Sequence, residues 1–355
     1  MTDEGGAGIL NIRPRALLLR WLWVESTVEG RMPLHLWDRD GCVYQLMDLP
    51  SEGALSTADL KPLVAIPELV SSRGFAPEVC FTRETVIACE KSDADDELAQ
   101  ALVCRDLRTG ARLWRREMQV EAIAPGVACG VVRAIERLDP GCLRFHYLQA
   151  ETGDSCAFSD RDNPLEDSLI FLSSVPGGHD LWVECVDSSS GETVHMVWAW
   201  QGLSECQPPQ LVTDPPFHWA PHFSPSGREA LDIDPKGDEI IHYSWPGGVE
   251  LTRINYRVDG IFDAISIRDG LALIVDSNKR MWAYVLARGE CIGEICVEGF
   301  PVVPGPVFDP APHNTWSLYS RSGDLLFCKG FTVPEGEDCS FILSCTDILR
   351  ALERE

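Results

Sequence analysis

Short apolar runs alternate with clusters of turn-forming residues along most of the 355-residue chain. The runs are rich in β-branched and aromatic residues, which favour strands over helices. Residues 104–114 show the pattern clearly, because an apolar start leads to the pair Thr109-Gly110 and then to a second run ending at Trp114. This spacing predicts a strand, a tight turn and a returning strand.

The same strand–turn–strand unit recurs at regular intervals. Its turn glycines are Gly110, Gly153, Gly191, Gly247, Gly289 and Gly323. The mean separation of consecutive glycines is about 43 residues. A period of about 40–45 residues that holds four short strands is typical of the blade of a β-propeller. One such blade cannot bury both of its apolar faces alone, so we expect the units to stack around a ring.

Residues 104–114 resemble the repeat of quinoprotein-type propellers. In that repeat Asp, Gly and Trp occupy the third, seventh and eleventh positions, which here are Asp106, Gly110 and Trp114. The quinoprotein dehydrogenases themselves are exported enzymes and typically carry adjacent cysteines at the cofactor. Neither an export signal nor adjacent cysteines occur in this sequence, so the match predicts blade structure and no cofactor.

Residues 221–245 resemble a blade of the WD-repeat or TolB-like propellers. Such a blade opens with Phe-Ser-Pro-x-Gly, which here runs from Phe223 to Gly227, before a strand, a turn and another strand. The Trp-Asp and Gly-His marks of WD repeats occur only singly, at Trp37-Asp38 and at 178–179. The resemblance therefore implies a propeller without indicating a subfamily.

We therefore expect an all-β fold, with a single β-propeller domain over residues 1–355. Seven four-stranded blades fit the period best, and six or eight are the alternatives. The expected blades are approximately 8–48, 75–118, 122–158, 168–201, 215–256, 260–298 and 305–345.

Three segments fall outside the regular period. A short, partly helical insertion is expected near 51–74, and the strand Ser340–Ser344 is expected to close the ring by pairing with the first blade. The tail from Thr346 to Glu355 reads as one short helix, with Thr346 as its N-cap and Asp347 in its first turn.

Charge narrows the range of partners. The sequence carries 30 basic and 55 acidic side chains, a formal net charge of −25, and its isoelectric point is about 4.6. Nucleic acids and anionic membranes would repel so acidic a protein, so neither is expected as a partner.

The compartment follows from the N-terminal segment and the cysteines. The longest apolar run, Ala16–Val24, is interrupted by Arg20 and is too short to span a membrane. No export signal is evident, so the 14 cysteines are expected to be reduced thiols and the protein is expected to be cytoplasmic.

Catalytic signatures are missing from the sequence. It contains no nucleophile elbow, no phosphate-binding glycine loop and no dinucleotide fingerprint. The segment Asp232–Glu239 fails as a calcium loop, because Lys236 takes a ligand position and Tyr243 stands where a glutamate is needed. No catalytic residue, metal or cofactor is predicted. If the protein is instead a hydrolase or lyase, the first candidates are His218, His222, Asp232 and Asp234.

The function expected from these features is that of a non-catalytic interaction scaffold or adaptor, one subunit of a larger assembly whose partner has a basic surface. The predicted contact regions are 51–74, the acidic loop at 91–97 and the proline-rich loop at 214–222. Within them the candidate contact residues are Asp95, Asp96, Glu97, His218, Trp219 and His222. A small-molecule sensor with its ligand in the central channel is a further alternative.

Overall fold

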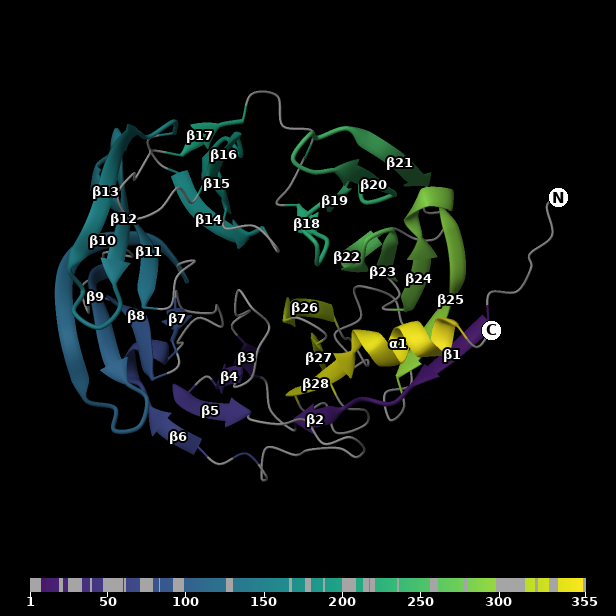
Figure 1. Cartoon of the computed structure of the whole chain (residues 1–355), viewed down its shortest axis with the longest axis horizontal. Coiled ribbons are helices and arrows are strands. Elements are labelled where there is room, and N and C mark those ends of the chain that lie inside the picture. Colours follow the sequence, from purple (N-terminus) through teal and green to yellow (C-terminus); the bar gives the residue numbers. More distant parts are fainter. Residues whose placement is uncertain are drawn as a thin grey trace.

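The structure is a computed structural model. It describes residues 8–18, 22–24, 34–38, 40–46, 60, 62–70, 79–82, 84–91, 99–125, 130–165, 168–175, 180–187, 189–199, 209–212, 217, 221–234, 236–255, 261–276, 280–297, 317–322, 325–331 and 338–353. Strands dominate these residues, and their sheets follow one another around a central axis (Figure 1). This is the arrangement of a β-propeller, and the predicted all-β class is confirmed.

The first half of the ring contains two sheets. One holds β3 (Trp23–Val24), β4 (Leu34–Trp37), β5 (Cys42–Leu46) and β6 (Pro62–Ala65) in that order. The other has seven consecutive strands: β7 (Val79–Phe81), β8 (Thr85–Lys91), β9 (Ala99–Asp106), β10 (Arg112–Pro125), β11 (Val131–Asp139), β12 (Cys142–Gln149) and β13 (Ser155–Asp162).

Two four-stranded sheets follow. The β14 sheet contains β14 (Ser168–Ser174), β15 (Leu181–Asp187), β16 (Thr193–Trp198) and β17 (Gln210–Leu211). The β18 sheet contains β18 (His222–Phe223), β19 (Glu229–Ile233), β20 (Glu239–Ser244) and β21 (Glu250–Asn255).

The last two sheets each take up a strand from the N-terminal segment. The β22 sheet consists of β22 (Ile261–Arg268), β23 (Leu271–Asp276), β24 (Met281–Val285), β25 (Glu290–Val297) and, on the outer edge, β1 (Gly8–Ile12). The final sheet consists of β26 (Ser317–Ser322), β27 (Leu325–Phe331), β28 (Asp338–Ser344) and β2 (Ala16–Leu18).

The seven-stranded sheet folds over on itself at β10. The strand pairs with β9 as far as Val120 and with β11 from Val120 onward, and its register shifts on both sides of that residue. The two halves then pack face to face, since Leu102 on β9 and Val132 on β11 lie in one buried cluster. Beyond the bend, β10 contacts β7 and β14. One long strand therefore serves two structural units.

Apolar side chains fill the spaces between successive sheets. At the junction of the β14 and β18 sheets, the rings of Trp182 and Trp245 lie 5.5 Å apart. One junction earlier, Phe145 and Trp198 meet at 5.0 Å. Each fully buried side chain of this size contributes about 2–3 kcal/mol. Trp182, Trp198 and Trp245 thus help to hold neighbouring sheets together.

The N-terminal segment closes the ring. Its strand β1 runs parallel to β25, and β2 pairs antiparallel with β28. Residues 16–18 were expected in the first blade, but they form the outer strand of the last sheet and cover an edge that would otherwise be open. The expected pairing of Ser340–Ser344 with the N-terminal segment is therefore present, in a different sheet.

The segment 51–74 is described at residue 60 and at 62–70. There it supplies β6, the outer strand of the first sheet, followed by a single 3₁₀ turn, η2 (Pro67–Leu69). The described part of this segment therefore belongs to a blade and is not a separate insertion. Pro62 fits at the start of an edge strand, where its missing N–H breaks no inner ladder.

The predicted C-terminal helix is present as α1 (Cys345–Leu352). Its N-cap is Ser344 and not Thr346, because the Ser344 hydroxyl accepts a hydrogen bond from the Asp347 amide at 3.2 Å. Asp347 lies in the first turn, as expected. No helix in the described residues is long and apolar enough to cross a membrane.

Several acidic side chains accept hydrogen bonds from backbone amides within turns. Asp106 Oδ1 accepts from the Thr109 amide at 2.7 Å, and Asp187 Oδ1 accepts from the Ser190 amide at 2.6 Å. The hydroxyls of Thr109 and Ser189 donate to the same two oxygens, and these bonds, together with the amide bonds, hold the pKa of both carboxyls below the usual range. Asp234 Oδ1 likewise accepts from the amides of Asp238 and Glu239, which makes 232–239 an acidic turn.

Candidate functional site

Most of the predicted contact residues lie outside the described residues: Asp95, Asp96, Glu97, His218 and Trp219. His222 is described, and it is an exposed residue of β18. It pairs with Leu231 in the register of β18 and β19, so Asp232 points to the opposite face of that sheet. The structure therefore does not bring His222 and Asp232 together on one face.

Buried histidines beside glutamates form a recurrent feature of three structural units. His146 Nε2 on β12 lies 2.8 Å from Glu136 Oε2 on β11. His242 Nε2 on β20 lies 2.9 Å from Glu229 Oε2 on β19. In the β14 sheet, β15 and β16 carry Glu184 and His195, which are directly opposite one another in the register, whereas in the other two units the histidine is opposite the residue two positions from the glutamate.

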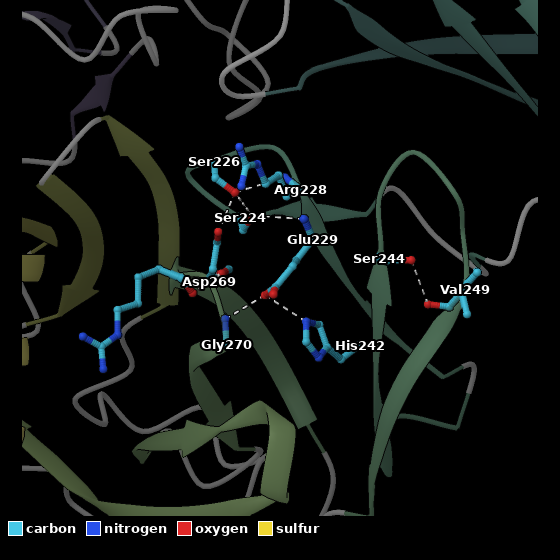
Figure 2. Close-up of polar contacts among 11 residues, drawn as sticks. Ser224, Ser226, Arg228, Glu229, His242, Ser244, Val249, Asp269 and Gly270 are labelled. Carbon is cyan, nitrogen blue, oxygen red and sulfur yellow. Dashed lines mark hydrogen bonds and ion pairs between the residues drawn. The ribbon is translucent and has the colours of Figure 1, made fainter.

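The His242–Glu229 pair belongs to a polar network between the β18 and β22 sheets, in which Nε2 of His242 is paired and Nδ1 is buried without a partner in the described structure (Figure 2). Glu229 Oε2 also accepts a hydrogen bond from the Gly270 amide at 2.7 Å, which ties the turn between β22 and β23 to the β18 sheet. Beside it, the Ser226 hydroxyl donates to Asp269 Oδ1 at 2.6 Å. The half-buried carboxylate of Glu229 thus accepts hydrogen bonds from two sheets.

Glu184 is different. Only 5% of the residue is exposed. Within the described part of the chain its carboxylate has no hydrogen-bond or ion-pair partner, and its oxygens keep a small contact with solvent. Burial raises the pKa of the Glu184 carboxyl, and the nearby carboxylate of Asp232 raises it further. Asp232 is itself buried, on the face of β19 that meets the β14 sheet.

Two further polar atoms beside Glu184 are also unpaired in the described structure. They are Nδ1 of His195 and Nε1 of Trp182, on residues that are 3% and 0% exposed. Their rings meet edge to face at 5.0 Å. Burial lowers the pKa of His195 to about 4, so this ring is neutral at pH 7. We call Trp182, Glu184, His195 and Asp232 together the Glu184 site.

Exposed apolar side chains flank the Glu184 site on β14. Leu169 and Phe171 are 55% and 51% exposed, whereas the alternating residues Ser168 and Ile170 are buried. Phe171 is directly opposite Glu184 in the register. Strand β14 is the edge of its sheet nearest the ring axis (Figure 1). An apolar edge next to an unpaired buried carboxylate is suited to a ligand that combines apolar and cationic parts.

No group of three His, Cys, Asp or Glu residues within the described ranges is arranged to hold a metal ion. Sequence reasoning overlooked the Glu184 site, although a signal was present. Glu184 is the one charged residue in the apolar run 181–186, where an acid on a buried strand needs an explanation.

Comparisons with known proteins add little. No protein-family model matches the chain, and no curated protein matches it in sequence. Among solved structures, it is similar to the β-propeller domain of Cps50 (Swd1) from Myceliophteria thermophila, at 10% identity over 90% of this chain and 96% of that one. The TM-score is 0.48. The architecture described above therefore rests on the sheets of this chain alone.

Proposed function

We propose that the protein is a non-catalytic interaction scaffold, a subunit of a larger cytoplasmic assembly that holds a partner protein with a basic surface. The observation that carries this proposal is the pair of exposed apolar side chains on β14, Leu169 and Phe171. Exposed apolar groups gathered on one rigid strand are typical of a protein contact surface.

The proposal includes a ring of seven blades. The bend in β10 supports this number, because it divides the seven-stranded sheet into two blades. The five other sheets supply one blade each. A closed ring of this kind is rigid, so a partner would meet preformed edges and loops.

Charge and cysteine usage support the remaining parts. A net charge of −25 favours a basic partner surface through electrostatic steering. All described cysteines are free thiols, and several of them are buried in strands, which suits a reducing compartment such as the cytoplasm.

The test is affinity capture of partners from the native cell with matched variants. Leu169→Ser/Phe171→Ser removes the apolar edge of β14. Phe158→Ser/Leu251→Ser removes two side chains of similar exposure from β13 and β21. We expect the β14 variant to lose at least tenfold of the specifically captured partner and the control to retain it. Equal retention by both variants, or a wild-type protein that captures nothing specific, contradicts the proposal.

A further inference from the structure

We infer that Glu184 receives the cationic side chain of an arginine or lysine from the partner protein, at the junction between the β14 and β18 sheets. This inference rests on the proposed function, and it specifies the chemistry by which the partner is recognised.

No described side chain balances the negative charge of Glu184. A buried carboxylate is strongly disfavoured unless it is paired and hydrogen-bonded. At Glu136 and Glu229 the chain supplies a histidine nitrogen within 3 Å. At Glu184 no described residue supplies one, and the carboxyl of Asp232 lies nearby, so a like charge adds to the cost. A guanidinium or ammonium group from outside would supply both the charge and the N–H donors.

The unit that contains Glu136 shows how this chain surrounds a cation elsewhere. In the register of β11 and β12, Glu136 is directly opposite Arg144, two residues before His146. The Arg144 guanidinium lies 4.5 Å over the ring of Phe158 and forms two hydrogen bonds with Asp160. This unit therefore holds its own cation between an aromatic ring and carboxylates.

The β14 sheet also has an aromatic ring beside its acid, but the ring belongs to Phe171 on the inner strand β14 and not to the outer strand, and no described residue of this sheet places a cation opposite Glu184. The residue two positions before His195 is Thr193, and Glu184 is opposite His195 and Phe171. The rings of Phe171 and Trp182 offer faces or edges of the kind on which arginine and lysine side chains pack. Phe171 is half exposed on the strand nearest the ring axis, and the inference places the approach of the incoming side chain on that side.

Two ring nitrogens near Glu184 also lack hydrogen-bond partners among the described residues. His195 Nδ1 and Trp182 Nε1 are buried without partners in the described structure, on the same sheet face as Glu184. Buried polar atoms are normally paired. Unpaired ring nitrogens also occur in the described ranges at His242 and Trp198, and what distinguishes the Glu184 site is that two of them lie on the same sheet face as an unpaired carboxylate. Neutral His195 adds no positive charge that would repel a cation.

The experiment titrates the full-length protein with three capped tripeptides: acetyl-Ala-Arg-Ala-amide, its lysine counterpart, and its citrulline counterpart, which is a neutral isostere of arginine. Binding is measured by calorimetry and by the shift in melting temperature. For wild type we expect the arginine or lysine peptide to bind at least tenfold more tightly than the citrulline peptide. Glu184→Gln should abolish this preference, and Glu192→Gln, at an exposed turn residue, should preserve it.

Several results would overturn the inference. One is equal affinity of wild type for the three peptides, or no binding of any of them at millimolar concentration; neither result depends on a variant that must fold. Another is an unchanged preference in Glu184→Gln. If the β14 variant loses its captured partner while Glu184→Gln keeps it, the scaffold proposal survives and this inference fails. If both variants keep the partner, both fail.

Discussion

Arg15 and Asp347 are 332 positions apart in the sequence and are joined by two hydrogen bonds, from Arg15 Nε to Asp347 Oδ2 at 2.5 Å and from Nη2 to Oδ1 at 2.8 Å. Arg15 lies between β1 and β2, and Asp347 lies in the first turn of α1. The pair therefore fixes the N-terminal segment to the C-terminal helix at the point where the ring closes.

Replacing Arg15 with Met should lower the free energy of unfolding by about 1 kcal/mol, because a two-point arginine–carboxylate pair that is partly shielded from water exceeds the usual surface ion pair. Urea denaturation measures the loss. As a control, Arg253→Met removes a more exposed arginine from its pairs with Glu239 and Glu250 and should cost less. A larger loss for Arg253→Met than for Arg15→Met would contradict this account of ring closure.

Substitutions at Gly153 and Gly191 distinguish backbone strain from steric overlap when a turn glycine is replaced. Both have positive φ, at 75° and 72°. A Cβ on Gly153 would lie 2.8 Å from the indole of Trp114, whereas a Cβ on Gly191 would meet nothing within 4 Å. Gly191→Ala should cost about 1 kcal/mol through backbone strain alone, and Gly153→Ala about 1–3 kcal/mol more through overpacking. Thermal unfolding of the two variants checks this, and equal losses would refute the packing role of Trp114.

The repeating turns could be predicted from sequence because they depend on residues close together in the chain. Gly110, Gly153, Gly191 and Gly289 all adopt positive φ, as the turn pattern indicates. In the turn for which Gly247 was predicted, the residue with positive φ is Gly248. The sequence has glycine at both positions, so the turn pattern does not distinguish them. The position of Gly323 lies outside the described residues.

Contacts between distant parts of the chain were harder to predict. No local pattern indicates that Gly8–Ile12 runs beside β25, or that Ala16–Leu18 belongs to the last sheet, since both pairings join segments almost a full chain apart. The Glu184 site was missed for the same reason. The apolar run 181–186 indicates that Glu184 is unusual, but the Asp232 carboxyl that faces it belongs to the next sheet and could not be placed from sequence.

Buried neutral histidines should make the protein sensitive to acid. Burial lowers the pKa of His195 from 6.5 to about 4, so the unfolded chain takes up its proton before the folded one does. Its contribution to stability is therefore complete above pH 6.5 and is lost as the pH falls toward 4, by up to about 3 kcal/mol. His35, whose pKa burial also lowers to about 4, should act in the same direction.

The variant His195→Phe isolates this contribution, since a phenyl ring can keep the contact with Trp182. Urea denaturation of wild type and variant at several pH values between 4 and 7 should show a shallower loss of stability for the variant. Parallel pH profiles for the two proteins would argue that His195 titrates normally in the folded state.

The stability of Glu184→Gln relative to wild type tests most directly the claim that Glu184 is a buried carboxylate without a partner among the residues that the structure describes. Because the folded pKa of Glu184 is raised above its ordinary 4.5, the carboxylate destabilises the fold as the pH rises from 4.5 through the folded pKa. Asp232 and His195 face it from the neighbouring strands; Asp232 strengthens the effect, and neutral His195 does not offset it.

Free energies of unfolding should be measured in urea at pH 4 and pH 8, with Glu136→Gln as the matched control, because Glu136 has His146 as its partner. We predict that Glu184→Gln and wild type differ little at pH 4 and that the variant is more stable by about 1–3 kcal/mol at pH 8, while Glu136→Gln is less stable than wild type. A Glu184→Gln protein that is less stable than wild type at pH 8 would contradict the account, because Glu184 would then hold the fold together and would have no need of a partner.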